Sequence, residues 1–424
     1  MTPEIKHRIG QIRRGEMPEG YNRVRDSIIP SDWKQYCLGE LGKNKNGLNF
    51  HREDKGIKIR ILGVRDFGNL SVLRDLNALS EISMRFMPDD ELLLKNGDIV
   101  FVRSNGSKEL VGRNLLVYPQ NEKVSFSGFC IRFRLSSDKI TTAEYINLLL
   151  DNGVLKQKLQ SENQGSNISN LNQSIIDNLQ ISIPCKGEQQ KIATILTTQD
   201  RVIELKEKQL AGKQRQKKYL MQQLLTGKKR LPGFYGAWSF PKAKELFQSV
   251  SDKDHNGDLA VLSSTQDRGI VPRDEVDVDI KYDACSLVNY KKVSKGNFVI
   301  SLRSFQGGIE YSTYTGLVSP AYTVLSSRKE ISDGYYKQFF KSTDYINRLN
   351  VAVYGIRDGK QISYEDFGRL RIPNPPIKEQ DAIAEVLSTA DHEIDLLQQD
   401  IEQEKQKKKA LMQLLLTGIV RVKI

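Results

Sequence analysis

Apolar residues recur at heptad spacing in two long stretches of the chain. Spacings of three and four residues place such side chains on one face of a helix, and that face must be buried against a partner. We predict that these positions form a helix–helix and partner interface: Ile192, Leu196, Ile203, Leu210, Leu220 and Leu224 in the first stretch, and Ile383, Leu387, Ile394, Leu397, Ile401, Leu411 and Leu415 in the second. Each stretch follows a proline and ends at a glycine, Gly227 or Gly418, as helix boundaries often do. A helix of about 38 residues is roughly 57 Å long.

The two stretches are copies of one another. Residues 188–227 align with residues 379–418 at a constant offset of 191 without a gap, and 18 of the 40 positions are identical. Such self-similarity indicates a duplicated unit. The two helices are each other's obvious partner, and we expect them to pair antiparallel about a pseudo-twofold axis.

The segments between the helices are richer in strand patterns. Short apolar runs broken by Gly and Asn occur at 57–64, 98–102, 115–117 and 129–135, and such runs favour strands. The second half repeats this plan, with Leu231-Pro232 and Trp238 where the first half has Ile29-Pro30 and Trp33. We therefore predict an α+β fold in which two long antiparallel helices join two β-rich domains. The predicted boundaries are 1–20 for an N-terminal helical segment, 21–183 and 229–373 for the domains, and 184–228 and 374–424 for the helices.

The N-terminal segment carries Ile5, Ile9 and Ile12 at helical spacing after Pro3. We expect a short basic helix that packs beside the end of the second long helix.

Charge points to a polyanionic partner. The formal net charge is +12, and Lys and Arg near phosphates provide sequence-independent affinity for nucleic acid. Residues 186–230 hold 12 basic and 4 acidic residues, whereas residues 377–424 hold 7 basic and 9 acidic residues. The two copies therefore have opposite signs, and we expect them to attract each other or to face different partners. No apolar run approaches 18 residues, which favours a soluble cytoplasmic protein.

Motifs that suggest catalysis are incomplete. Asn374-Pro375-Pro376 resembles the motif with which amino-methyltransferases hold a base, but it lacks the aromatic residue, so we interpret it as a helix-start linker. Asp252 begins an EF-hand-like loop whose twelfth position is Ser263 instead of Glu. Pro88-Asp89-Asp90 lacks the further acids of a nuclease, and the four cysteines stand far apart. We predict no catalytic residue and no metal site.

The helical repeat resembles a known family. Ile181 to Pro184, Glu188-Gln189 and the later LLTGKKRLPGF from Leu224 are similar to the specificity (S) subunit of type I restriction-modification enzymes. The resemblance implies a noncatalytic, sequence-specific DNA-binding subunit with two target recognition domains. Each domain would bind one half of a bipartite asymmetric target, and the paired helices would set the spacer. It also implies two methylation (M) subunits and two motor-nuclease (R) subunits as partners. S-adenosylmethionine and ATP would be bound by those partners, and no cofactor by this chain.

Candidate DNA contacts come from side-chain chemistry. Arg, Asn and Gln can bind base edges bidentately, while Ser more often holds phosphate. The residues of this kind on Gly-rich loops of the two domains are Arg65, Asn69, Arg103, Ser104, Asn105, Gln266, Arg268, Arg303, Ser304 and Gln306.

Two other hypotheses stay open at this point. A coiled-coil scaffold would bind only protein partners and would protect no specific DNA sequence. A lone methyltransferase or nuclease would act without partners. The target sequence cannot be predicted, because recognition depends on loop conformation and DNA shape as well as on side chains.

Overall fold

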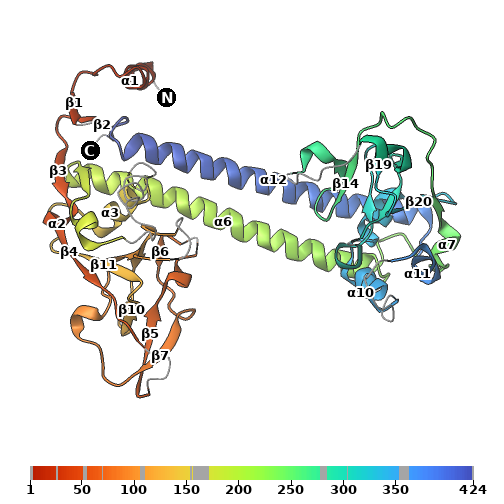
Figure 1. The fold of residues 1–424 in the computed structure, drawn as a ribbon, viewed down its shortest axis with the longest axis horizontal. Helices are drawn as coiled ribbons and strands as arrows, with labels where there is room; N and C mark the ends of the chain where they lie inside the picture. Colours follow the sequence, from red (N-terminus) through yellow and green to blue (C-terminus); the bar gives the residue numbers. More distant parts are fainter. Residues whose placement is uncertain are drawn as a thin grey trace. The chain divides into compact units, whose positions relative to one another are not determined.

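Two helices of 39 residues each, α6 (Lys186–Leu224) and α12 (Ile377–Leu415), connect the parts of the chain (Figure 1). The computed structural model describes residues 3–24, 27–50, 55–68, 70–105, 110–152, 155, 171–276, 284–302, 304–352 and 362–422. The chain forms two units. Unit 1 comprises Met1–Glu204 with Glu402–Ile424, and unit 2 comprises Leu205–Ile401. Each unit thus contains part of both long helices, whereas the predicted boundaries kept each helix whole.

Unit 1 is built around two sheets. The larger has the strand order β4-β11-β8-β9-β6, and the smaller has the order β10-β5-β7, in which β5 pairs parallel with β10. Their strands are β4 (Gly42–Asn46), β5 (Ile57–Leu62), β6 (Val72–Leu73), β7 (Ser80–Met84), β8 (Asp98–Val102), β9 (Asn114–Val117), β10 (Val124–Phe126) and β11 (Cys130–Leu135). Two further pairs are β1 (Tyr21–Val24) with β2 (Ser27–Pro30), and β3 (Lys34–Cys37) with β12 (Gln180–Ile183).

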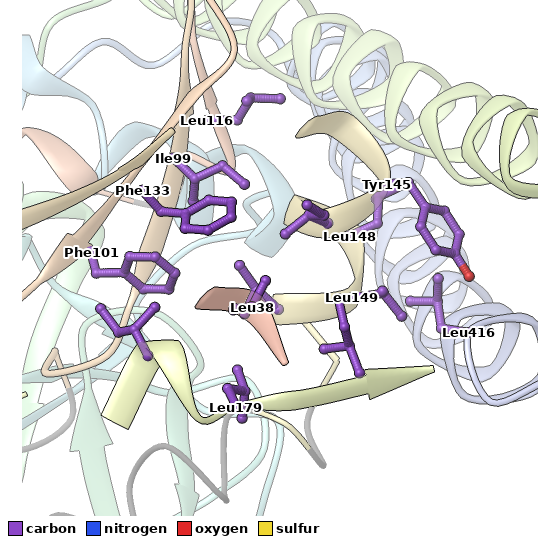
Figure 2. Close-up of a cluster of buried hydrophobic side chains, with 14 of the residues drawn as sticks. Leu38, Ile99, Phe101, Leu116, Phe133, Tyr145, Leu148, Leu149, Leu179 and Leu416 are labelled. Carbon is purple, nitrogen blue, oxygen red and sulfur yellow. The ribbon is translucent and has the colours of Figure 1, made fainter. Parts of the chain in front are cut away.

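Short helices complete unit 1. They are α1 (Pro3–Arg13), α2 (Leu38–Leu41), α3 (Ala143–Leu150) and α5 (Gln173–Asp177), with 3-10 turns η1 (Val64–Phe67) and η2 (Asp90–Leu92). The main core joins β8, β11 and α3 to the start of α6 and the end of α12. Figure 2 shows part of this cluster, in which Leu416 of the α12 end lies with Tyr145 and Leu149 of the α3 region. The start of α6 and the end of α12 are both buried here. Their apolar residues therefore form part of the core of unit 1 and are not used for helix pairing alone.

Unit 2 holds a four-stranded sheet of order β13-β20-β17-β18, the hairpin of β14 with β15, and a further antiparallel pair of β16 with β19. The strands are β13 (Phe247–Val250), β14 (Leu262–Thr265), β15 (Gly269–Pro272), β16 (Lys291–Val293), β17 (Phe298–Ile300), β18 (Glu310–Tyr311), β19 (Gly316–Val318) and β20 (Thr323–Ser327). The helices are α7 (Ala243–Leu246), α8 (Ser304–Gly307), α9 (Asp333–Phe339), α10 (Thr343–Ala352) and α11 (Tyr364–Arg369), with 3-10 turns η3 (Arg273–Glu275) and η4 (Ala284–Asn289).

The core of unit 2 is mainly aromatic. Phe247 contacts Phe298, Tyr336, Phe340 and Phe367 at ring-centroid distances of 5.2 to 6.0 Å. Such tilted and edge-on pairs add to the hydrophobic stabilisation. Leu224 of α6 and Ile383 and Leu387 of α12 are buried in the same cluster. Each unit therefore anchors one end of each long helix in its core.

The predicted α+β fold with its two β-rich domains, long antiparallel helices and internal repeat is confirmed. Gly227 and Gly418, predicted to end the helices, have φ of 71° and 72°, the left-handed conformation in which helices commonly end. The N-terminal helix lies beside the end of α12, as expected, because Arg8 Nη1 donates to the carbonyl of Ile419 at 3.3 Å.

Candidate nucleic-acid interface and its helical support

A buried carboxylate near the start of each long helix binds an arginine that follows the end of the other. In unit 1, Arg421 Nε and Nη2 donate to the two carboxylate oxygens of Glu188, both at 2.8 Å. In unit 2, Arg230 Nε and Nη2 donate to those of Glu379 at 2.5 and 2.6 Å. Both carboxylates are fully buried. At the offset of 191, Glu188 corresponds to Glu379 and Arg230 corresponds to Arg421. The same contact therefore occurs in both units.

The surroundings of the two pairs differ. Arg421 also binds Asp32, at 2.9 and 2.7 Å, whereas Glu379 accepts a bond from Trp238 Nε1 at 3.0 Å. The hydrogen bond to Glu188 is the main cause that raises the pKa of Arg421, and the hydrogen bond from Arg421 lowers the pKa of Asp32.

A glutamine that follows each buried glutamate ties the helix to the preceding segment. Gln189 Nε2 donates to the carbonyls of Ile140 and Pro184 at 2.8 and 2.9 Å. Gln380 Nε2 donates to the carbonyl of Pro375 at 2.8 Å and to Asn374 Oδ1 at 3.0 Å. Asn374 is thus used in anchoring α12, which supports the interpretation of its motif as a helix-start linker.

Ion pairs join α6 to α12 in each unit, and those of unit 2 follow an antiparallel order. In unit 1, Lys408 binds Asp200 at 2.5 Å. Its repeat in unit 2 is the pair of Lys217 with Asp391. Unit 2 adds pairs of α6 lysines with α12 acids, Lys206 with Asp400 at 2.8 Å and Lys213 with Glu393 at 2.6 Å. The expected attraction between the basic first copy and the acidic second copy is confirmed inside unit 2.

The predicted interface residues are buried or partly buried in both helices. Those near the helix ends, such as Ile192 and Leu387, are fully buried in the domain cores. In the middle of the helices, Leu210 and Leu397 are only partly covered, whereas Ile203 and Ile401 are buried. The long helices therefore combine apolar burial at their ends and at these two central positions with ion pairs along their length.

In unit 1, the two candidate loops lie next to the turn at residues 127–129, between β10 and β11. No residue of this turn was among the predicted DNA contacts. Arg65 is exposed on η1 and lines a hollow of about 670 Å³ together with Glu81, Ser127 and Phe129. The backbone N–H of Arg103 donates to the carbonyl of Phe129 at 2.8 Å. Phe129 itself is 62% exposed. An exposed aromatic ring that lines the same hollow as Arg65 suits contact with a base or a thymine methyl group.

The other candidates of unit 1 are Ser104, Asn105 and Asn69. Ser104 and Asn105 are partly buried and follow Arg103 directly. Asn69 lies outside the described residues.

In unit 2, two candidate loops contact each other. Gln266 and Arg268 are exposed on the turn of the β14–β15 hairpin, and Gln306 is exposed on α8. A Cβ placed on Gly307 would lie 2.8 Å from Gln266 Cγ. The structure thus brings the hairpin turn and α8 together, although about 40 residues separate them in sequence.

One candidate in unit 2 needs correction. Ser304 is 1% exposed, and its hydroxyl accepts a bond from the backbone N–H of Ser301 at 2.8 Å. The side chain of Ser304 does not face solvent, because its hydroxyl is turned toward the backbone of Ser301, directly after β17. Arg303 lies outside the described residues.

Within the described ranges, none of the helices combines the length and the apolar composition of a membrane span, and no group of three His, Cys, Asp or Glu side chains is arranged to hold a metal ion.

These features define a class of protein: a duplicated recognition protein that carries two different β-rich units on one repeated helical framework. The family model described as "Type I restriction modification DNA specificity domain" matches residues 30–212 and again residues 236–406. The chain belongs to this family. It is therefore a DNA-binding specificity subunit, the noncatalytic recognition component of a type I restriction-modification enzyme, as the resemblance predicted.

Two specificity subunits and one solved structure are similar to this chain over most of its length. The chain is 24% identical to the type I restriction enzyme MjaVIII specificity subunit of Methanocaldococcus jannaschii, over 96% of this chain and 97% of the relative. It is 24% identical to the EcoKI specificity subunit of Escherichia coli, over 86% and 81%. A solved chain from work on complex assembly of the type I system superposes with a TM-score of 0.59 over 92% of this chain and 99% of that one, at 17% identity. That last likeness concerns the fold alone.

Proposed function

We propose that each unit binds one half of a bipartite, asymmetric DNA target and that α6 and α12 set the spacer between the halves. One observation carries this proposal: the helix contacts repeat at the offset of 191, whereas the candidate loops differ. Arg65 stands on a 3-10 turn in unit 1, while Gln266 and Arg268 stand on a hairpin in unit 2. A shared framework with unlike loops suits two unlike half-sites held at a fixed separation.

Two methylation subunits would dock along the helices, and two motor-nuclease subunits would complete the enzyme. Leu205 and Leu396 support this part of the proposal, because they occupy equivalent repeat positions and both are 50% exposed. Two equivalent apolar positions on the framework fit two copies of one partner. S-adenosylmethionine and ATP would be bound by those partners.

The test is a domain exchange. The chain is co-expressed with the methylation subunit of its own system, and modified adenines are mapped by single-molecule sequencing. We expect a split motif with a fixed gap. Replacing residues 231–370 with the corresponding segment of another specificity subunit should change one half of the motif and leave the other half and the gap as they were. A complex that forms but modifies no specific motif would instead favour a helical scaffold that binds only protein.

The spacer can be tested separately. One heptad is inserted after Glu204 in α6 and another after Ile401 in α12, so that the ion pairs of each unit stay in register. Seven residues lengthen a helix by about 10 Å, or about three base pairs of B-DNA. The gap should change, or binding should be lost, without a change in either half-site. An unaltered gap would show that the helices do not set it.

A further inference from the structure

Lys341 lies between α9 and α10, and its ammonium group joins three other parts of unit 2. It donates to the carbonyl of Gln266 on the β14–β15 turn at 3.2 Å and to the carbonyl of Gly307 on α8 at 3.0 Å. Its third contact is the carboxylate of Glu310 on β18. An ammonium group has three N–H donors, so these three acceptors use all of them.

The carboxylate of Glu310 is buried, with 3% of its side chain exposed. Its second oxygen has no hydrogen-bond partner within the described residues and lies on the side of Gly269, where an added Cβ would be 3.9 Å away. Burial raises the pKa of Glu310, and Lys341 opposes that rise. A buried carboxylate needs a cation beside it, and Lys341 is that cation. The pair therefore stands directly beneath the hairpin turn.

The backbone around the pair is tightly packed. Gly308 has a φ of +81°, and a Cβ there would lie 2.1 Å from the carbonyl oxygen of Phe340. A Cβ on Gly307 would lie 2.8 Å from Gln266 Cγ. The glycines let α8 and its following residues approach both the hairpin turn and the segment that carries Lys341. Small shifts of Lys341 would thus be transmitted to both loops.

We propose that Lys341, with Glu310, is a positioning residue that fixes the two target-binding loops of unit 2 relative to each other; this inference rests on the proposed function. The exposed side chains of Gln266, Arg268 and Gln306 extend from the loops that Lys341 joins. Unit 1 has a threonine at the equivalent position, since alignment of Tyr345-Ile346 with Tyr145-Ile146 places Thr141 opposite Lys341. The effect of Lys341 is therefore confined to one half-site.

The experiment uses the full chain in complex with its methylation subunit. Lys341→Met removes the ammonium group and keeps most of the side-chain volume. The control is Lys337→Met, which removes the same charge from neighbouring α9, where the ammonium lies 6.0 Å from the Tyr311 ring centroid. Competition with duplexes altered in one half-site at a time measures discrimination. We expect Lys341→Met to lower discrimination tenfold or more in one half-site, with the other half-site and nonspecific affinity unchanged. Lys337→Met should change neither half-site.

The outcomes separate this inference from the proposed function. A wild-type complex without a split motif would overturn the proposed function. A normal wild-type motif with full discrimination by Lys341→Met in both halves would overturn the role of Lys341 alone. Equal losses of nonspecific affinity in Lys341→Met and Lys337→Met would reduce Lys341 to a phosphate contact. If Lys341→Met does not fold, Lys341→Gln, which retains two N–H donors, is measured by the same criteria.

Discussion

Removing Arg230 from its buried pair with Glu379 should destabilise unit 2 strongly, because it leaves a buried charge without its main partner. Glu379 is fully buried and accepts two bonds from Arg230 and one from Trp238, so Arg230→Met would leave its charge with a single donor. Breaking a buried pair from one side costs about 3–5 kcal/mol. The side chain of Arg230 keeps 26% exposure, which admits water, so we expect a cost near the lower end, about 3 kcal/mol.

A double-mutant cycle separates the pair from its surroundings. Glu379→Gln removes the charge but keeps an oxygen for Trp238, and should cost about 2 kcal/mol. In the double variant no unpaired charge remains, so its cost should fall below the sum of the two single costs by at least about 1 kcal/mol. Additive costs would mean that the two side chains stabilise the unit independently.

Tryptophan fluorescence can follow the two units separately. The chain has two tryptophans, Trp33 in unit 1 and Trp238 in unit 2. Trp33→Phe is a suitable background because the buried Trp33 Nε1 has no hydrogen-bond partner within the described residues. Urea unfolding in that background reports on Trp238 alone. Arg421→Met, the repeat-equivalent change in unit 1, is the matched control and should leave the Trp238 midpoint unchanged. Equal shifts from Arg421→Met and Arg230→Met would refute the assignment of each pair to its own unit.

Two further predictions concern binding. Arg65→Ala should cost about 1–3 kcal/mol of discrimination at one position of one half-site, as loss of a base contact does, and should leave the unfolding midpoints unchanged; a uniform loss over all sequences would indicate a phosphate contact. Leu205→Asp and Leu396→Asp should each remove one methylation subunit from the complex, and the double change both, as counted by native mass spectrometry; retention of both subunits by the double variant would exclude this docking surface.

The long helices could be predicted from sequence because their signals are local. Heptad spacing, a preceding proline and a terminal glycine all lie within the helix or next to it. The helices end at Leu224 and Leu415, three residues before the predicted Gly227 and Gly418, which have left-handed φ. For the sheets, the sequence predicted only the short apolar runs that form strands, and not which strands pair. The parallel pairing of β5 with β10 depends on residues about 60 positions apart, and three-residue strands such as β10 carry too little alternation to define a partner.

The site was harder to predict because exposure of a loop residue depends on distant packing. Ser304 and Gln306 stand two positions apart in one polar loop, yet Ser304 is buried and Gln306 is exposed. The paired Glu188 and Arg421 did leave a signal, since both recur at the offset of 191. An acidic residue in the first turn of a helix is common, because it interacts favourably with the helix dipole. Because the helix dipole alone explains an acidic residue there, the sequence did not point to the contact of Glu188 with an arginine more than 200 residues away.

Divergence of the two helices favours pairing of α6 with α12 over pairing of α6 with its own copy in another chain. The first-copy positions equivalent to Asp400, Glu393 and Asp391 are Gln209, Val202 and Asp200. A pair of α6 helices in the same register would therefore keep the lysine–aspartate contact of Lys217 but lose the acidic partners of Lys206 and Lys213. Exposed ion pairs contribute about 0.5 kcal/mol each, so the two lost pairs favour the mixed arrangement by about 1 kcal/mol, or about fivefold. Covalent connection of the helices in one chain contributes more, since it raises their effective concentration to about the millimolar range. The charge difference therefore adds to the preference of α6 for α12, which covalent connection within one chain already provides.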